Sequence, residues 1–173
     1  MKEAILDAAE GRARRGGYNG FSFRDLAQDV GIKSASVHYH FPTKEQLAEV
    51  LAHRYVDRMA AHLGDPTKLQ PRAAVKHLAD VFIKANEADD QMCLCGVFAA
   101  ESGGLPPQVL PEVAAFFDLI SKWLDVALRP AENAPKAAEI IAAFEGAMLM
   151  SRVMRDPAIL RGVVSATLKR ISR

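Results

Sequence analysis

The chain has 173 residues, of which half are hydrophobic and a quarter are charged. This composition supports a packed core and excludes an intrinsically disordered protein. The net charge of +1, from 22 Lys and Arg against 21 Asp and Glu, excludes the strongly basic balance of a non-specific nucleic-acid binder. We find no secretory signal, and no apolar run approaches the roughly 18 residues needed to cross a bilayer. The chain has two cysteines. We therefore expect a cytoplasmic protein with reduced thiols and no membrane association.

The first helix is predicted over residues 2–16. Four apolar residues recur at helical spacing and are expected to face the core (Ile5, Leu6, Ala9 and Ala13). Three arginines follow toward the end of the helix (Arg12, Arg14 and Arg15). In solvent these cations would complement the helix dipole, and beside DNA they would attract its backbone. The sequence leaves both interpretations open.

Residues 21–40 have the pattern of a helix-turn-helix. Ser22 suits an N-cap, with Asp25 three residues later at the positive end of the helix dipole. An apolar stripe follows at positions i, i+3, i+4 and i+7 (Phe23, Leu26, Ala27 and Val30). Gly31 stands where a helix commonly ends in the left-handed conformation. The spacing predicts a short helix that ends in a tight turn.

A second short helix is expected over residues 34–40, with Ser34 as its cap. Pro42 stops this helix, and Thr43 caps the next one. The side chains of residues 34–40 include hydroxyls and imidazoles, which can hydrogen-bond to phosphates and base edges. Two short helices joined by a glycine turn form a DNA-reading motif. An ordinary helical hairpin with a polar face would have the same pattern.

The rest of the chain is predicted to be helical as well. Helices are expected at about 44–63, 71–88, 92–102, up to 128, 135–155 and 157–172, with loops at 103–107 and 130–135. No segment shows the period-two alternation of a strand. The fold class is therefore all-α, with about nine helices.

Aromatic and sulfur side chains are frequent in the C-terminal part. They would suit a pocket for a small apolar or aromatic effector, and they make an equally good ordinary core. The candidates for lining such a pocket are Phe82, Cys93, Phe116, Phe117, Trp123 and Met148.

Cys93 and Cys95 are the two thiols. Two residues apart on a helix, they would lie about 200° apart around its axis and could not form a disulfide without unwinding. No His or Cys partners have the spacing of a zinc site, so no metal is expected. The thiols either act as small apolar core residues or form a redox sensor whose modification releases DNA.

The last two helices carry long apolar stripes. Six residues represent them: Ile140, Phe144, Met148, Leu160, Val164 and Leu168. The stripes form either an intramolecular core or a homodimer face. A recognition helix of about seven residues reads few base pairs, and dimers gain specificity by reading two half-sites. We therefore expect these residues to form a dimer face.

The N-terminal quarter resembles the DNA-binding domain of the tetracycline-repressor (TetR/AcrR) family of bacterial transcriptional regulators. The resemblance runs from ILDAA at Ile5 through GGYNGFSFRDLAQDVGIKSASVHYHFPTKEQL. It is carried by Ala27, Gly31, the run 37–41 and Lys44. The chain departs from the family pattern at residues 12 and 13, where the family usually has leucine and phenylalanine.

The resemblance implies a DNA-binding domain at 1–45, with the helix-turn-helix at 21–40, and an effector-binding and dimerisation domain at 46–173. The implied DNA-binding residues are Arg24, Lys33, Ser34, Ala35, Ser36, His38, Tyr39, His40, Thr43 and Lys44. Of these, Tyr39, His40 and Lys44 would contact phosphates, while Ser34, Ala35, Ser36 and His38 would face the groove. The segment MCLCGVFAAE also resembles one found in part of the family, where a cysteine opens the ligand-pocket helix.

The implied protein is a homodimeric repressor on a double-stranded, palindromic DNA operator, released by a small-molecule effector. No cofactor is implied, and no arrangement of acid, base or nucleophile indicates an enzyme. The rival hypothesis is a helical ligand-binding or assembly protein in which the helix-turn-helix is only scaffold. Its support is the near-neutral charge of residues 1–58, with nine Lys and Arg against eight Asp and Glu.

Overall fold

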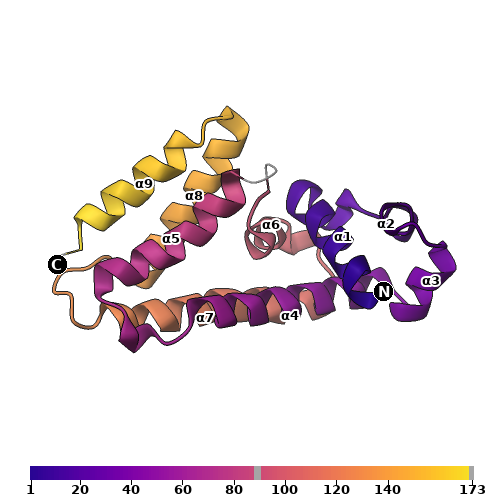
Figure 1. Cartoon of the computed structure of the whole chain (residues 1–173), viewed down its shortest axis with the longest axis horizontal. Coiled ribbons are helices and arrows are strands. Elements are labelled where there is room, and N and C mark those ends of the chain that lie inside the picture. The colour runs from indigo at the N-terminus through magenta and orange to yellow at the C-terminus, as the bar shows by residue number, and fades with distance from the viewer. Residues whose placement is uncertain (88–90, 172–173) are drawn as a thin grey trace. The chain divides into compact units, whose positions relative to one another are not determined.

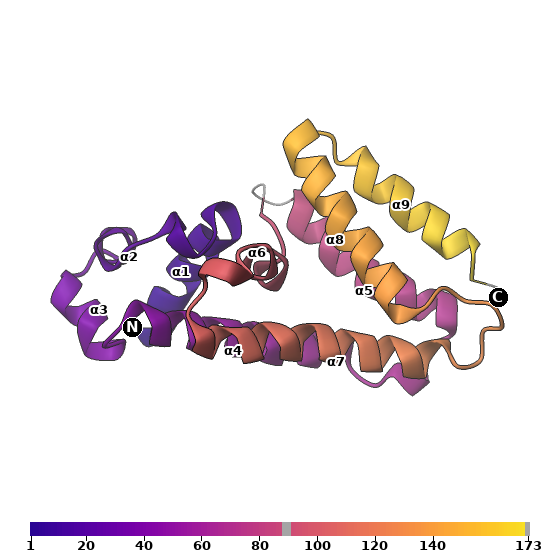
Figure 2. The ribbon, with the colours of Figure 1, turned by 180° about the vertical axis from the view of Figure 1, so that it is seen from behind.

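The computed structural model describes residues 1–87 and 91–171. Within these ranges the chain forms nine α-helices and no strand, which confirms the predicted all-α class (Figures 1 and 2). The helices are α1 (Lys2–Gly16), α2 (Phe23–Val30), α3 (Ser34–His40), α4 (Lys44–Leu63), α5 (Pro71–Glu87), α6 (Leu94–Ala100), α7 (Leu110–Leu128), α8 (Ala137–Met154) and α9 (Ala158–Lys169). None of the described helices is long and apolar enough to cross a membrane.

The chain packs as two compact units. Unit 1 comprises Met1–Arg58 and Cys93–Phe116, and unit 2 comprises Met59–Met92 and Phe117–Arg173. Unit 1 therefore contains α1, α2, α3 and α6, while unit 2 contains α5, α8 and α9. The functional boundary predicted after residue 45 stays a prediction, because packing does not say which part reads DNA or binds an effector.

The local signals around α2 give the helix its predicted ends. The Asp25 N–H donates to Ser22 Oγ at 3.3 Å, and the Ser22 N–H donates to Asp25 Oδ2 at 2.8 Å. This reciprocal capping box satisfies two N–H groups that the start of a helix leaves without partners. Gly31 ends α2 with φ 71° and ψ 35°, the left-handed conformation that glycine adopts at low cost. Both assignments are confirmed.

The start of α3 differs from the prediction by one residue. Lys33, with extended backbone, is the N-cap, and its carbonyl accepts a hydrogen bond from the Ser36 N–H at 2.9 Å. Ser34 is already helical, so it does not cap α3. Its hydroxyl therefore lies on the exposed first turn. The predicted cap of α4 is confirmed, since the Gln46 N–H donates to Thr43 Oγ1 at 3.2 Å.

Unit 1 has a closed apolar core beneath α2 and α3. The four residues predicted to face inward on α1 are all at most 2% exposed (Ile5, Leu6, Ala9 and Ala13). Leu26 from α2, Val37 from α3 and Leu47 from α4 are fully buried. Each short helix thus contributes one large apolar side chain to the core, which fixes α3 while leaving its other side in solvent.

Unit 2 is built on α5, α8 and α9, which lie side by side in both views (Figures 1 and 2). The rings of Phe82 and Phe144 meet edge to face with centroids 5.8 Å apart. Hydrophobic burial of this kind is the main force that holds helices of such length together.

The residues predicted for the dimer face lie in this core. Ile140, Phe144, Met148, Leu160 and Val164 are at most 6% exposed, and Leu168 is half-buried. Burial within one chain places these side chains in its own core, the first of the two alternatives left open by the sequence. Their contact with a second copy stays a prediction.

The segment around the thiols also differs from the prediction. A helix was expected over 92–102, whereas α6 spans only Leu94–Ala100, and two short 3-10 turns occupy part of the expected loop (Ser102–Gly104 and Pro107–Val109). Residue 88, where one helix was expected to end, and residue 172, the expected end of the last helix, lie outside the described residues.

Candidate nucleic-acid interface

The predicted recognition helix, α3, presents one polar face to solvent. Val37 anchors the helix from below, while Tyr39 is 84% exposed. Most of the predicted DNA-binding residues are exposed: Arg24, Lys33, Ser34, Ala35, His38, Tyr39 and Thr43. The three others are half-buried: Ser36, His40 and Lys44. Because Tyr39 is so exposed, most of its side chain is accessible to a ligand.

Aromatic contacts orient the histidines of α3. The His38 ring meets Phe23 of α2 edge to face, with centroids 4.7 Å apart. The rings of Tyr39 and His40 are likewise perpendicular, at 5.3 Å. These contacts restrict the imidazoles, so a hydrogen bond to DNA would cost less side-chain entropy.

Lys44 at the start of α4 is held by aromatic rings. Its Nζ lies 4.4 Å from the centroid of Tyr18 and 4.6 Å from that of Phe21. Burial lowers the pKa of Lys44, although nearby carboxylates, including Glu45, oppose the shift. The ammonium therefore has a fixed position, stabilised by cation–π attraction. Sequence reasoning did not predict the role of Tyr18.

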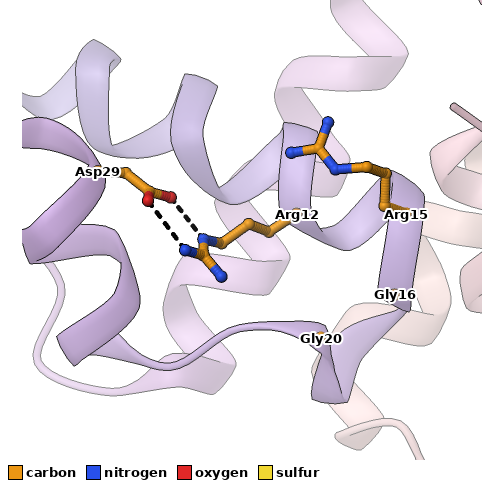
Figure 3. Close-up of a pocket in the computed structure, with 5 residues that line it drawn as sticks. All are labelled: Arg12, Arg15, Gly16, Gly20 and Asp29. Atoms are coloured by element: carbon orange, nitrogen blue, oxygen red, sulfur yellow. Dashed lines mark hydrogen bonds and ion pairs between the residues drawn. The ribbon is translucent and has the colours of Figure 1, made fainter. Parts of the chain in front are cut away.

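Arg12 links the end of α1 to α2. Its Nη2 donates to Asp29 Oδ1 at 2.9 Å, and its Nε donates to Oδ2 (Figure 3). The guanidinium keeps the pKa of Asp29 below its ordinary value of 3.8. Arg12 therefore joins α1 to α2 through an exposed ion pair, and its contact with DNA stays a prediction. It borders a polar cleft of about 460 Å³, with Arg15, Gly16 and Gly20 on the other sides.

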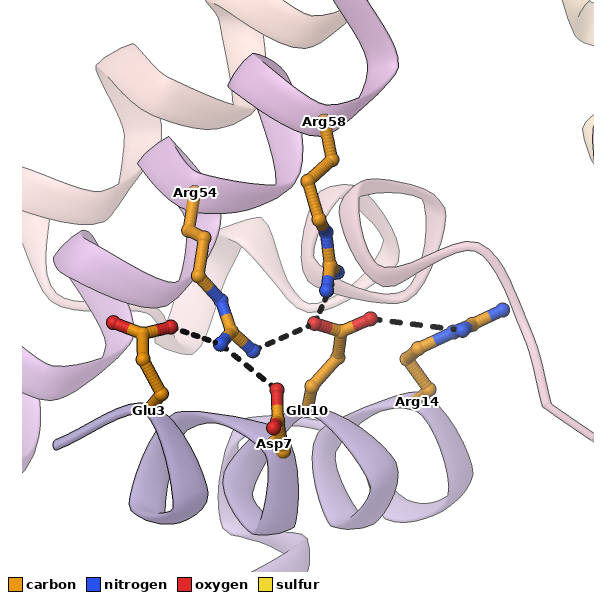
Figure 4. Close-up of polar contacts among 6 residues, drawn as sticks. All are labelled: Glu3, Asp7, Glu10, Arg14, Arg54 and Arg58. Carbon is orange, nitrogen blue, oxygen red and sulfur yellow. Dashed lines mark hydrogen bonds and ion pairs between the residues drawn. The ribbon is translucent and has the colours of Figure 1, made fainter. Parts of the chain in front are cut away.

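A second ionic network holds α1 against α4. Arg54 Nη1 donates to Glu3 and Asp7 at 2.9 Å each, and Nη2 donates to Glu10 at 3.1 Å (Figure 4). Arg58 also donates to Glu10. Glu10 is only 8% exposed, and these cations compensate for the burial of its carboxylate. The sequence did contain a signal, because the three acids recur at one face of α1.

The two thiols are buried in unit 1. Cys93 is 3% exposed and Cys95 is fully buried. Cys93 is the N-cap of α6, where its Sγ accepts a hydrogen bond from the Gly96 N–H at 3.4 Å. It therefore precedes the helix, and the angle expected for two residues on one helix does not apply. Burial, with both cysteines nearby, raises the pKa of Tyr55 well above its ordinary value.

The residues predicted to line an effector pocket are divided between the units. Cys93 and Phe116 belong to unit 1, whereas the other four belong to unit 2 (Phe82, Phe117, Trp123 and Met148). All but the half-buried Phe117 are at most 6% exposed. Their contact with an effector stays a prediction. Among the described residues, no group of three or more His, Cys, Asp or Glu side chains is arranged to hold a metal ion.

Comparison with known proteins agrees with this architecture. Residues 5–51 match the family model described as "Bacterial regulatory proteins, tetR family". The biofilm operon negative regulator IcaR of Staphylococcus aureus is 41% identical over 49 residues, a match that covers 28% of this chain and 26% of IcaR. The match thus spans about a quarter of that relative. A transcriptional regulator from Lactococcus lactis is 26% identical over 92% of this chain and 87% of its own.

Solved structures extend the likeness to the whole chain. A TetR transcriptional regulator from Legionella pneumophila is 33% identical, with a TM-score of 0.92, over 99% of this chain and 97% of its own. A TetR-family regulator from Agrobacterium tumefaciens is 31% identical, with a TM-score of 0.91 and the same coverage. Residues 5–51 match the family model, and two solved TetR regulators are more than 30% identical over the whole chain. The chain therefore belongs to the TetR family of DNA-binding transcriptional regulators.

Proposed function

We propose that the protein is a homodimeric repressor that binds a palindromic operator and is released by a small-molecule effector in residues 46–173. The observation that carries the DNA-binding part is the exposed face of α3 above a fully buried Val37. A rigid helix with free polar side chains is what direct readout in the major groove requires. The negative regulator IcaR, whose match covers 28% of this chain, supports repression.

The residues of the interface divide into two roles. Tyr39, His40 and Lys44 contact phosphates, with Arg24, Lys33 and Thr43 beside them. Ser34, Ala35, Ser36 and His38 face the base edges. Contacts of the first kind set affinity, and those of the second kind set sequence preference.

The dimer face proposed here adds an exposed stripe on α8 to the residues predicted from the sequence. Ala142, Gly146, Leu149, Met150 and Val153 recur at i, i+4, i+7, i+8 and i+11. Leu149, Met150 and Val153 are 49%, 55% and 83% exposed. Exposed apolar side chains that follow one helix face mark an interaction surface, and the small residues at 142 and 146 allow close approach of a second helix.

The effector acts through a difference in affinity. It must bind the released state better than the DNA-bound state, and that difference is its largest possible effect. A second candidate input is modification of Cys93. The added atoms would displace the buried Sγ from the Gly96 N–H that it now accepts and would disturb the start of α6.

The test is a selection of genomic fragments, including DNA beside the protein's own gene, at two salt concentrations. Specific binding by the unaltered chain and its loss in Tyr39→Ala support the proposal. Leu110→Ala removes another exposed apolar side chain and serves as the control, because Leu110 lies outside α2 and α3. If no fragment is selected, the helix-turn-helix is scaffold and the proposal is wrong.

A further inference from the structure

The C-terminal end of α6 binds the backbone beside α1. Glu101 is the C-cap of α6. Its Oε2 accepts a hydrogen bond from the Tyr18 N–H at 2.7 Å. The two residues are 83 positions apart in the sequence, and both belong to unit 1. A helix from the C-terminal part of the chain is thus tied to the segment that leads into the helix-turn-helix.

The backbone at Gly17 is shaped around this carboxylate. Gly17 has φ 73°, a conformation that other residues rarely adopt. A Cβ at this position would lie 1.9 Å from Glu101 Oε1, an impossible distance for two atoms that are not bonded. Position 17 therefore requires glycine for two independent reasons, and one of them is Glu101 itself.

Tyr18 carries the contact onward to α4. Its ring is only 9% exposed. Its hydroxyl hydrogen-bonds to Glu45, and Lys44 Nζ lies over its ring at 4.4 Å. Tyr18 is thus held by Glu101 at its backbone and by the first turn of α4 at its ring. That turn directly follows the recognition helix and contains the cation assigned to a phosphate contact.

From this geometry we propose that Glu101 is a positioning residue for DNA binding. Its carboxylate fixes Tyr18, and Tyr18 fixes Lys44 and the first turn of α4. A displacement of Glu101 would free these groups and lower the affinity for DNA. The inference rests on the proposed function and deepens it, because it names a residue of α6 that sets the affinity of the DNA-binding surface.

The experiment measures operator affinity against salt for the full chain with Glu101→Ala and Glu101→Gln. Glu101→Ala should lower affinity roughly tenfold, as is typical for coupling between sites, and should reduce the salt slope by about one because one phosphate contact is lost. Glu101→Gln keeps a side-chain oxygen that accepts a hydrogen bond from the Tyr18 N–H. The DNA affinity of this variant should therefore lie between those of the unaltered chain and Glu101→Ala. Glu112→Ala, which removes a carboxylate bound to His53 in the same unit, should behave like the unaltered chain.

A combined change tests the route through Tyr18. Tyr18→Phe removes the hydroxyl bound to Glu45 and leaves the backbone N–H that Glu101 accepts. The losses of DNA affinity caused by Tyr18→Phe and Glu101→Ala should therefore be less than additive in the double variant.

Nuclear magnetic resonance supplies a measurement without DNA. Glu101→Ala should shift the amide signals of residues 44–46, and Glu101→Gln takes its place if the alanine variant does not fold. Unchanged signals there would overturn the proposal, as would unchanged affinity and salt slope. Failure of the unaltered chain to select DNA would instead refute the proposed function.

Discussion

At the scale of single residues, the proposed interface depends on a few fixed cations and aromatic rings rather than on net charge. Lys44, for example, is held over the rings of Tyr18 and Phe21. The near-neutral charge of the N-terminal helices therefore does not argue against DNA binding, since placement decides which charges reach the phosphates.

Replacing Lys44 with Ala should weaken binding to all sequences alike, and the slope of affinity against salt should fall by about one. The loss of the cation–π contacts should also cost about 1 kcal/mol of stability. Binding titrations at several salt concentrations and urea unfolding measure the two effects. An unchanged slope in a folded variant would show that Lys44 contacts no phosphate.

His38→Ala should instead change the sequence preference, because this side chain is assigned to the base edges. Discrimination at one base pair should fall by about 1–3 kcal/mol. Selection from a randomised operator measures it, with Tyr39→Ala as the comparison that should lose affinity uniformly. If both variants lost affinity equally for all sequences, the assignment of His38 to base edges and of Tyr39 to phosphates would be wrong.

The lowered pKa of Asp29 makes the free energy of unfolding depend on pH. Its pKa in the folded protein lies below the ordinary value of 3.8, so its pair with Arg12 stabilises the fold fully above that value. The contribution disappears as the pH falls below 3.8 toward the folded-state pKa. The difference in unfolding free energy between the unaltered chain and Asp29→Asn should therefore be present at pH 7 and shrink in acid. Asp118→Asn, which alters an exposed pair with Lys122, should show little difference at pH 7.

At the scale of elements, local signals and long-range pairing differ in what the sequence reveals. Ser22 and Gly31 were assigned correctly, because a cap and a left-handed turn depend on neighbouring residues. The contacts of Arg54 and Glu101 were not foreseen, because each joins segments more than forty positions apart. The stripes on α8 show a related effect: that helix has a buried and an exposed apolar stripe, and periodicity alone does not say which one meets a second copy.

Arg54→Ala should destabilise the pairing of α1 with α4. Removing the guanidinium leaves the buried Glu10 with fewer cations, and breaking such a pair typically costs about 3–5 kcal/mol. Arg58 and Arg14 remain near Glu10 and should reduce the loss to the lower end of that range or below it. Urea unfolding measures it, with Lys122→Ala on the surface as control. A loss no greater than that of the control would contradict the role assigned to the network.

At the scale of the whole molecule, the proposed function requires two copies of the chain. One recognition helix reads few base pairs, so specificity needs two half-sites and a dimer that fixes their spacing. Val153→Glu on the exposed stripe of α8 should convert the dimer to a monomer and weaken operator binding. Sedimentation velocity measures the mass, and Lys122→Glu on α7 is the control. A dimer that persists with a charge at position 153 would place the interface elsewhere.

The most direct measurement is a footprint of the purified protein on a selected genomic fragment. For a dimer that places one α3 in each half-site, we expect two protected half-sites related by a palindrome. Their centres should lie one helical turn of DNA apart, about 34–36 Å, or a multiple of that distance. Tyr39→Ala should leave the DNA unprotected at the same protein concentration. Protection without sequence preference, or no protection of any fragment, would contradict the claim that α3 reads an operator.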